Sequence, residues 1–189
     1  MKYFTLAFAA VLYVASFAGE VIAQQAQHLL TIQLKDGPVV IELDPKNAPK
    51  HVAQIEALAK NGDYDNVAFH RVIDGFMAQT GDVQYGDMND GFDASAAGTG
   101  GSKLPDIPAE FSDVPFKRGT VGMARAQDPN SANSQFFIMF ADGDFLNGQY
   151  TVVGKVVSGM ENVDNIKRGE GQNGEVSDPD RMIKVTVGK

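Results

Sequence analysis

The chain repeats one pattern along most of its length: short runs of β-branched and aromatic residues, each bounded by turn-forming residues. Such runs are typical of β-strands, and Gly, Pro, Asn and Asp between them are typical of turns. We expect eight strands, centred on LLTIQL, VVIEL, VAFHRV, FMAQTG, GTVGMA, QFFIMF, YTVVGKVV and MIKVTV. Strands and helices do not alternate regularly, which argues against a parallel doubly wound sheet. The pattern predicts a mainly β fold, a closed eight-stranded antiparallel β-barrel.

Two segments have apolar residues at helical spacing. Residues 49–60 place Val52, Ile55 and Ala59 on one face over about three turns. Residues 159–168 repeat the pattern over a shorter length. We therefore expect two α-helices, one early and one late, which cap the ends of the barrel.

The first 23 residues have the pattern of a secretory signal peptide. Lys2 precedes an apolar run that ends near Ala15, and small or modest side chains at Val21 and Ala23 fit a cleavage site. An uncleaved membrane anchor is the alternative, but the run is shorter than the roughly 20 residues that a spanning helix needs. We expect cleavage after Ala23, which leaves one mature domain over residues 24–189 and no membrane attachment.

Charge and cysteine content narrow the possible functions. Asp and Glu outnumber Lys and Arg by 24 to 16, so the net charge is −8 and no basic surface for nucleic acid is expected. The chain has no cysteine, which excludes disulfides and thiol chemistry. His28, His51 and His70 are too scattered for the close pairs that mark many metal sites, and we interpret His70 as a packed residue. We expect no metal and no cofactor.

A long segment, residues 82–102, is rich in Gly and Asp and lacks periodicity, so we expect a surface loop. Within it, residues 87–93 have the composition of a calcium loop without the EF-hand spacing of Gly and Glu. Residues 98–103 resemble a phosphate loop but lack its spacing and its position between a strand and a helix. We interpret the first as a solvated loop and the second as a tight glycine bend.

Residues 69–81, FHRVIDGFMAQTG, place a permanent cation in an apolar stretch. Arg71 and Gln79 flank a turn at Asp74-Gly75, so we expect them to face each other across a hairpin. A guanidinium with five donors is costly to place among apolar groups without a partner. The alternative is an edge-strand arginine whose head reaches water, and this stretch alone does not decide between them.

Two further stretches supply residues for the same site. Gln135 and Phe137 share one strand face, because side chains alternate along a strand. Residues 145–150, FLNGQY, place two aromatic side chains and a leucine around an Asn-Gly turn. If these segments converge, they form an apolar pocket rimmed by Arg71, Gln79, Gln135 and Tyr150.

Three segments, FHRVIDGFMAQTGD, GMARAQDPNSANSQFFI and FLNGQYTVVGKV, resemble the signature segments of the cyclophilins, the cyclosporin-binding class of peptidyl-prolyl cis-trans isomerases. The resemblance covers residues 29–187 and implies an enzyme that isomerises X-Pro bonds in proline-containing polypeptides and assists their folding. It implies no cofactor and no covalent intermediate. The DPNSANSQFFI form resembles bacterial members, so together with the signal peptide it predicts a periplasmic protein, with a eukaryotic secretory compartment as the alternative. We expect the protein to be a monomer.

The resemblance also implies a role for each site residue. Arg71 would stabilise the twisted amide and Gln79 would orient Arg71. The substrate-binding positions implied are Phe76, Met77, Gly98, Thr99, Ala124, Arg125, Gln135, Phe137, Phe145, Leu146 and Tyr150. Three of these depart from the common pattern, since Arg125, Phe145 and Tyr150 stand where many relatives have asparagine, tryptophan and histidine.

Two other functions remain open from sequence. A non-catalytic peptide-binding module or holdase would use the same groove. A barrel that carries a small ligand would need an open apolar lumen, whereas the bulky runs FFIMF and VVIEL favour a filled one.

Overall fold

The computed structural model describes residues 28–90 and 92–188, and the expected signal peptide over residues 1–23 lies outside them. The strands are β1 (Leu29–Leu34), β2 (Gly37–Leu43), β3 (Val67–Ala68), β4 (Arg71–Ile73), β5 (Met77–Thr80), β6 (Thr120–Met123), β7 (Phe136–Met139), β8 (Val152–Ser158), β9 (Arg181–Met182) and β10 (Lys184–Val187). The helices are α2 (Pro49–Asn61), α3 (Met160–Asp164) and a 3₁₀ turn η1 (Asp144–Leu146). Across the described ranges, no helix has the length and apolar character to cross a bilayer.

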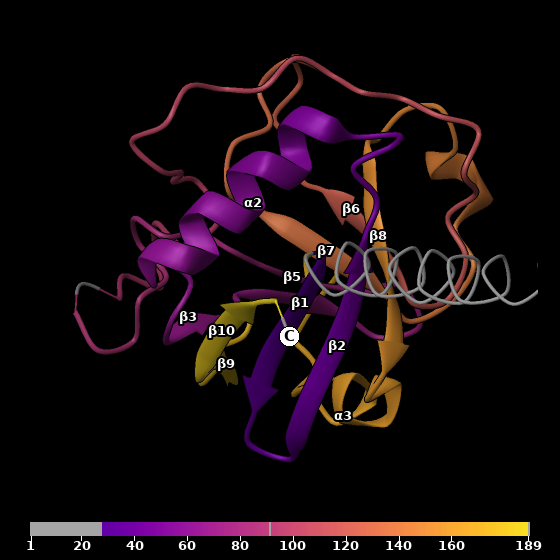
Figure 1. Cartoon of the computed structure of the whole chain (residues 1–189). Helices are drawn as coiled ribbons and strands as arrows, with labels where there is room; N and C mark the ends of the chain where they lie inside the picture. Colours follow the sequence, from indigo (N-terminus) through magenta and orange to yellow (C-terminus); the bar gives the residue numbers. More distant parts are fainter. Residues whose placement is uncertain (1–27, 91, 189) are drawn as a thin grey trace, which may run out of the picture.

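Eight strands form one antiparallel sheet in the order β10-β1-β2-β8-β6-β7-β5-β4, and β3 pairs with β9 in a small second sheet (Figure 1). The mainly β, eight-stranded antiparallel class is therefore confirmed. The sheet is a half-barrel rather than a fully closed barrel, because β10 and β4 are its edge strands and no ladder between them is found in the described part of the chain. The prediction of closure was slightly too strong.

Two predicted strands are each divided in the structure. VAFHRV splits into β3 and β4 at Phe69 and His70. The N–H of Phe69 donates to Asp180 O and the carbonyl of His70 accepts from Val176, so these two residues do not continue a single ladder from β3 into β4. MIKVTV splits into β9 and β10 at Ile183, whose N–H donates to Gln33 O. The second helix is also shorter than predicted and ends at Asp164.

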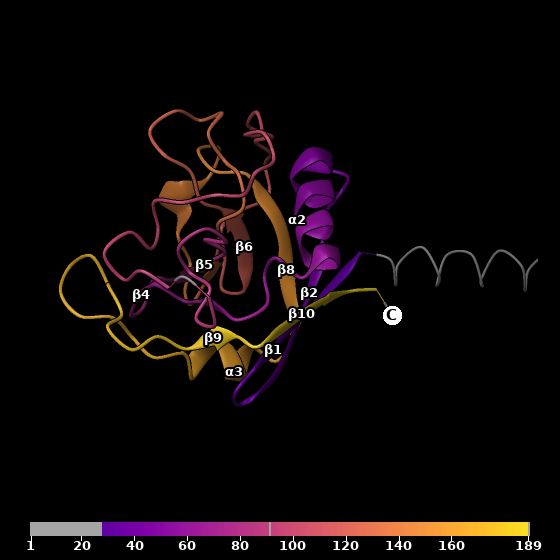
Figure 2. The same cartoon turned by 90° about the vertical axis from the view of Figure 1, so that its left-hand side faces the viewer.

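The two α-helices lie at opposite ends of the sheet in both views (Figures 1 and 2). Helix α2 begins with a proline in its first turn and ends at Asn61, and the following residue, Gly62, adopts a left-handed conformation at φ 81°. Glu110 caps its first turn from a distant loop: the carboxylate accepts the N–H groups of Lys50 and His51 at 3.1 Å, and His51 Nδ1 lies 2.7 Å from Oε2. Burial opposes ionisation of this carboxyl, but these hydrogen bonds outweigh it and lower the pKa of Glu110.

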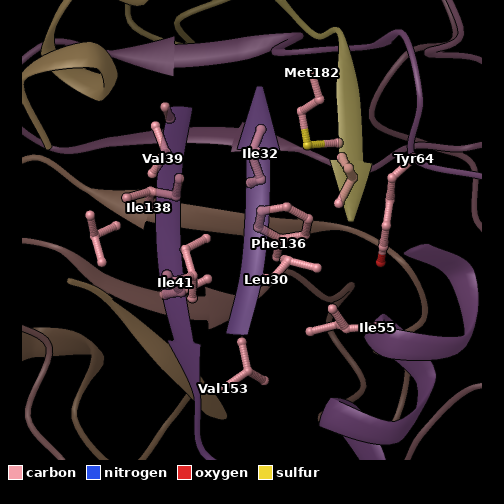
Figure 3. Packing of buried hydrophobic residues seen from close by; sticks show 14 of the residues in the cluster. Leu30, Ile32, Val39, Ile41, Ile55, Tyr64, Phe136, Ile138, Val153 and Met182 are labelled. Atoms are coloured by element: carbon pink, nitrogen blue, oxygen red, sulfur yellow. The ribbon is translucent and has the colours of Figure 1, made fainter. Parts of the chain in front are cut away.

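The main core fills the space between the sheet and α2. Alternate residues of β1 point inward, with Leu30 and Ile32 almost fully buried, and Ile55 reaches them from α2 (Figure 3). The labelled members of this cluster are Leu30, Ile32, Val39, Ile41, Ile55, Tyr64, Phe136, Ile138, Val153 and Met182. Because bulky side chains occupy the interior, the fold does not offer the open lumen that a small-ligand carrier needs.

A second, smaller apolar cluster lies apart from the main core. Its buried members are Met77, Phe116, Phe137, Met139, Leu146 and Val152. The rings of Phe116 and Phe137 stack with centroids 5.7 Å apart, and Gly122 on β6 makes this possible. A Cβ atom at Gly122 would lie 2.6 Å from atoms of both rings, so any larger residue would separate them. This cluster forms the floor of the site described next.

Candidate active site

The β4–β5 hairpin brings Arg71 directly opposite Gln79, as the turn signal predicted. Arg71 Nη1 donates to Gln79 Oε1 at 3.1 Å, and Nε donates to the carbonyl of Asn173 at 3.0 Å. Strand β4 is an edge strand, yet the guanidinium turns toward these partners and is partly buried. Burial lowers the pKa of Arg71 and the nearby Tyr150 opposes that effect, but an arginine remains a cation at any physiological pH.

A chain of side-chain amides continues from Arg71 into the sheet. Gln79 Nε2 donates to Gln135 Oε1 at 2.9 Å, and Gln135 Nε2 donates to the carbonyl of Gly100 at 2.8 Å. In both glutamines the side-chain oxygen accepts a hydrogen bond and the side-chain nitrogen donates one, which fixes the orientation of each amide. The position of Arg71 consequently depends on a loop more than twenty residues further along the chain.

Asp82 holds that loop in place, and its role was not predicted from the sequence. The carboxylate is fully buried directly after β5 and accepts four backbone N–H groups. Oδ1 accepts from Gln84 and Tyr85 at 3.1 and 3.0 Å, and Oδ2 accepts from Gly98 and Gly100 at 2.7 and 2.9 Å. Both ends of the loop that begins at Asp82 are thereby fixed to one carboxylate.

Gly98 adopts φ 96° directly above the ring of His70. A Cβ atom there would lie 3.0 Å from His70 Cδ2, so both the backbone angle and the close approach favour glycine. His70 is buried, as predicted, and burial lowers its pKa, which keeps the imidazole neutral at pH 7. The ring therefore supports the loop and does not enter a cavity.

Arg71 stands at the rim of a cavity of about 320 Å³, large enough for a proline ring and its neighbours. The lining residues are Arg71, Phe76, Met77, Gln79, Ala124, Arg125, Phe137, Phe145, Leu146 and Tyr150. Phe137 meets Tyr150 edge to face at 5.9 Å, while Phe76 and Phe145 lie 5.5 Å apart. The cavity thus combines an apolar floor with two arginines, Arg71 and Arg125, in its wall.

A second cavity of about 350 Å³ adjoins the first and shares Gln79, Ala124 and Arg125 with it. The remaining lining residues are Gly98, Thr99, Gly100, Ala126, Ser131, Asn133 and Gln135. All thirteen residues predicted for the site line one cavity or the other. Gln135, however, lies in the wall of the second cavity, not on the rim of the first, because its amide is held by Gln79 and Gly100.

Four lining residues were not predicted: Gly100, Ala126, Ser131 and Asn133. Gly100 lies in the stretch that we interpreted as a tight glycine bend, and Asn133 lies in the irregular segment before β7. Asn133 Oδ1 accepts hydrogen bonds from the N–H and hydroxyl of Ser102 at 2.7 Å, which ties those two loops together. Polar loop residues of this kind carry no periodic signal that would have identified them.

The loop over residues 87–93, which has the composition of a calcium loop, has a structural explanation. Asp87 Oδ1 accepts the N–H of Asn89, and Asp93 Oδ1 accepts the N–H and hydroxyl of Ser95, so these carboxylates cap local turns. Over residues 28–90 and 92–188, no group of three or more potential ligands could hold a metal ion.

We predict that Asp82→Asn loosens the site as well as the loop. In asparagine an NH₂ group would replace one of the two carboxylate oxygens, so two backbone N–H groups would face a donor and lose their acceptor. This loss should lower the free energy of unfolding by about 2 kcal/mol. Denaturant unfolding measures that loss. In NMR spectra the backbone amides of Gly98 and Gly100 and the side-chain amides of Gln135 and Gln79 should all shift.

The matched control is Asp93→Asn, which removes the same charge from an exposed turn in the same segment. It should leave the side-chain amides of Gln79 and Gln135 unchanged. If Asp82→Asn unfolds more easily but those two amides do not shift, Asp82 stabilises the loop without positioning the site.

Comparison with known proteins agrees with this geometry. A family model described as "Cyclophilin type peptidyl-prolyl cis-trans isomerase/CLD" matches residues 29–187. A Brucella suis protein named "Probable peptidyl-prolyl cis-trans isomerase" is 61% identical over 191 residues, covering 99% of this chain and 97% of the relative. A Helicobacter pylori peptidyl-prolyl cis-trans isomerase is 40% identical over 144 residues, covering 74% of this chain and 80% of the relative.

Solved structures give the same result. A Cryptosporidium parvum cyclophilin-type isomerase, crystallised in the presence of the dipeptide Ala-Pro, superposes with a TM-score of 0.72 at 27% identity and covers 85% of this chain and 99% of its own. The cyclophilin AquaCyp293 from Hirschia baltica superposes with a TM-score of 0.71 at 26% identity, covering 86% and 74%. From the family match, the close relatives and the shared fold, the chain belongs to the cyclophilin-type peptidyl-prolyl cis-trans isomerases.

Proposed function

We propose that this protein accelerates cis-trans isomerisation of X-Pro bonds in exported polypeptides, with Arg71 as the catalytic residue and Gln79 as the residue that positions it. Amide resonance gives the X-Pro bond a rotational barrier of about 20 kcal/mol, and uncatalysed exchange takes tens to hundreds of seconds. No covalent bond has to break. Catalysis requires only that the enzyme bind the twisted amide more tightly than either planar form.

The observation that carries the proposal is the placement of the guanidinium. Nη1 donates to Gln79 and to Met77 Sδ, and Nε donates to Asn173, which leaves the two N–H groups of Nη2 for the cavity that Arg71 lines. When the X-Pro amide twists, its lone pair localises on the prolyl nitrogen. A guanidinium N–H directed at that nitrogen stabilises the twisted amide selectively, in the manner of other preorganised donors.

The apolar part of the cavity complements this donor. Phe137, Met77 and Leu146 are almost fully buried and form a floor that suits a proline ring, while Phe145 is exposed at the edge. The second cavity extends the groove along the bound peptide.

We predict that Arg71→Ala lowers kcat/KM for an X-Pro peptide by about 100-fold to 1000-fold, the loss typical of removing one preorganised donor. A protease-coupled or NMR exchange assay measures this. Arg181→Ala is the matched control because Arg181 lines neither cavity and, among the described residues, its side chain donates only to Asn89, so the variant should keep the wild-type rate.

Two results would count against the catalytic assignment. An unchanged rate in Arg71→Ala would remove Arg71 from the mechanism. A wild-type protein that binds proline peptides and prevents aggregation without accelerating exchange would instead be a peptide-binding module.

We also propose that the enzyme is exported to the bacterial periplasm and acts there on folding clients as a monomer. The support is in residues 1–23, where Lys2 precedes an apolar run and Ala23 ends a cleavage pattern. Removing this segment takes away Lys2 and Glu20 together, so the net charge of the mature chain stays at −8.

Export predicts a mature N-terminus at Gln24. Expression of the full chain in a Gram-negative host, followed by osmotic shock and N-terminal sequencing, should recover the protein in the soluble periplasmic fraction beginning at that residue. Deletion of residues 2–23 should confine it to the cytoplasm. Recovery of the uncleaved full chain in the membrane fraction would favour an anchor instead.

A further inference from the structure

The two adjoining cavities carry a charge opposite to that of the whole molecule. The protein has a net charge of −8, yet the charged residues that line the cavities are Arg71 and Arg125, with no Asp or Glu among the lining side chains. Neither arginine forms an ion pair within residues 28–90 and 92–188. The groove is therefore a local positive site in an acidic protein.

Arg125 lies on the wall that the two cavities share, and its position is fixed without a counter-charge. Nη1 donates to Ala126 O at 2.8 Å, Nη2 donates to Gln149 O at 3.0 Å, and the guanidinium carbon lies 4.5 Å from the centre of the Tyr150 ring. Carbonyl groups and an aromatic face orient a guanidinium but leave its full charge in place.

The hydrogen bonds of Arg125 leave two N–H groups without a partner among the described residues, the buried one of Nε and one of Nη2. Nη1 uses both its N–H groups, on Ala126 O and, at 3.3 Å, Gln127 O. Nη2 uses one N–H on Gln149 O, so its second N–H has no partner among the described residues. Arg71 is held by Gln79 and Asn173 and lines only the first cavity, whereas Arg125 lines both. Arg125 is thus the cation that a client side chain beside the proline could contact.

We propose that Arg125 gives the enzyme a preference for client segments with an acidic side chain within two residues of the isomerised proline. The inference rests on the proposed isomerase function and adds a substrate class to it. The carboxylate would accept the free Nη2 N–H, as arginine and carboxylate groups pair in proteins. Because Arg125 is only partly buried, the preference should be modest, about fivefold, and should weaken with salt.

The test compares matched peptides that differ at one position. Each peptide carries a single X-Pro bond and has Glu, Gln or Lys at one of the four positions that lie within two residues of the proline. We measure kcat/KM for the wild-type protein at about 0.02 M and about 0.5 M salt. At one position or more, the Glu peptide should exceed the Lys peptide by about fivefold at low salt, and the ratio should approach one at high salt.

Variants assign the preference to Arg125. Arg125→Gln should bring the Glu-to-Lys ratio close to one, and Arg125→Lys should retain part of it, whatever either change does to the overall rate. Arg181→Gln removes the same charge outside both cavities and should keep the wild-type ratio. The ratio is read within each variant, so a general loss of activity does not imitate the effect.

The outcomes separate the two levels of the proposal. Equal turnover of Glu, Gln and Lys peptides by an active wild-type enzyme overturns the acidic preference and leaves the isomerase function standing. A preference that survives in Arg125→Gln as fully as in the wild type overturns the role of Arg125. If no peptide is turned over above the uncatalysed rate, the proposed function itself fails.

Discussion

A continuous set of hydrogen bonds joins the buried carboxylate of Asp82 to the guanidinium of Arg71. Asp82 fixes Gly100, the carbonyl of Gly100 holds Gln135, and Gln135 holds Gln79, which accepts from Arg71. Each contact is ordinary in strength, but together they give one permanent cation a defined direction in a partly buried setting. In a site where no bond is broken, that direction is the main chemical contribution the protein can make.

The apolar half of the site depends on a different constraint. The ring of Phe137 can form the floor of the cavity because Gly122, on the neighbouring strand, leaves room for it to stack on Phe116. Phe137 then meets Tyr150 edge to face, and Tyr150 in turn supports Arg125. Packing thereby connects the proline cavity to the cation on its shared wall, so the two cavities behave as parts of one groove.

Much of the strand pattern could be predicted, because turn residues bound each strand and alternation identifies its buried face. The hairpin that places Arg71 opposite Gln79 followed from one Asp-Gly turn. The division of VAFHRV into two strands could not be predicted, because it depends on partners near Asp180, more than one hundred residues away. The role of Asp82 was also invisible, since an aspartate that begins a glycine-rich loop looks the same in sequence whether it is solvated or holds four backbone N–H groups.

The central claim is that catalysis requires a directed guanidinium N–H and not merely a positive charge near the proline. Arg71→Lys separates the two, because an ammonium keeps the charge but lacks the planar set of donors that can contact Gln79 Oε1, Asn173 O and the cavity together. The decisive measurement is the cis-trans exchange rate of a saturating X-Pro peptide, followed by NMR magnetisation exchange. The account predicts that Arg71→Lys still binds the peptide but loses about 100-fold or more of the exchange rate. An exchange rate close to that of the wild type in Arg71→Lys would contradict it.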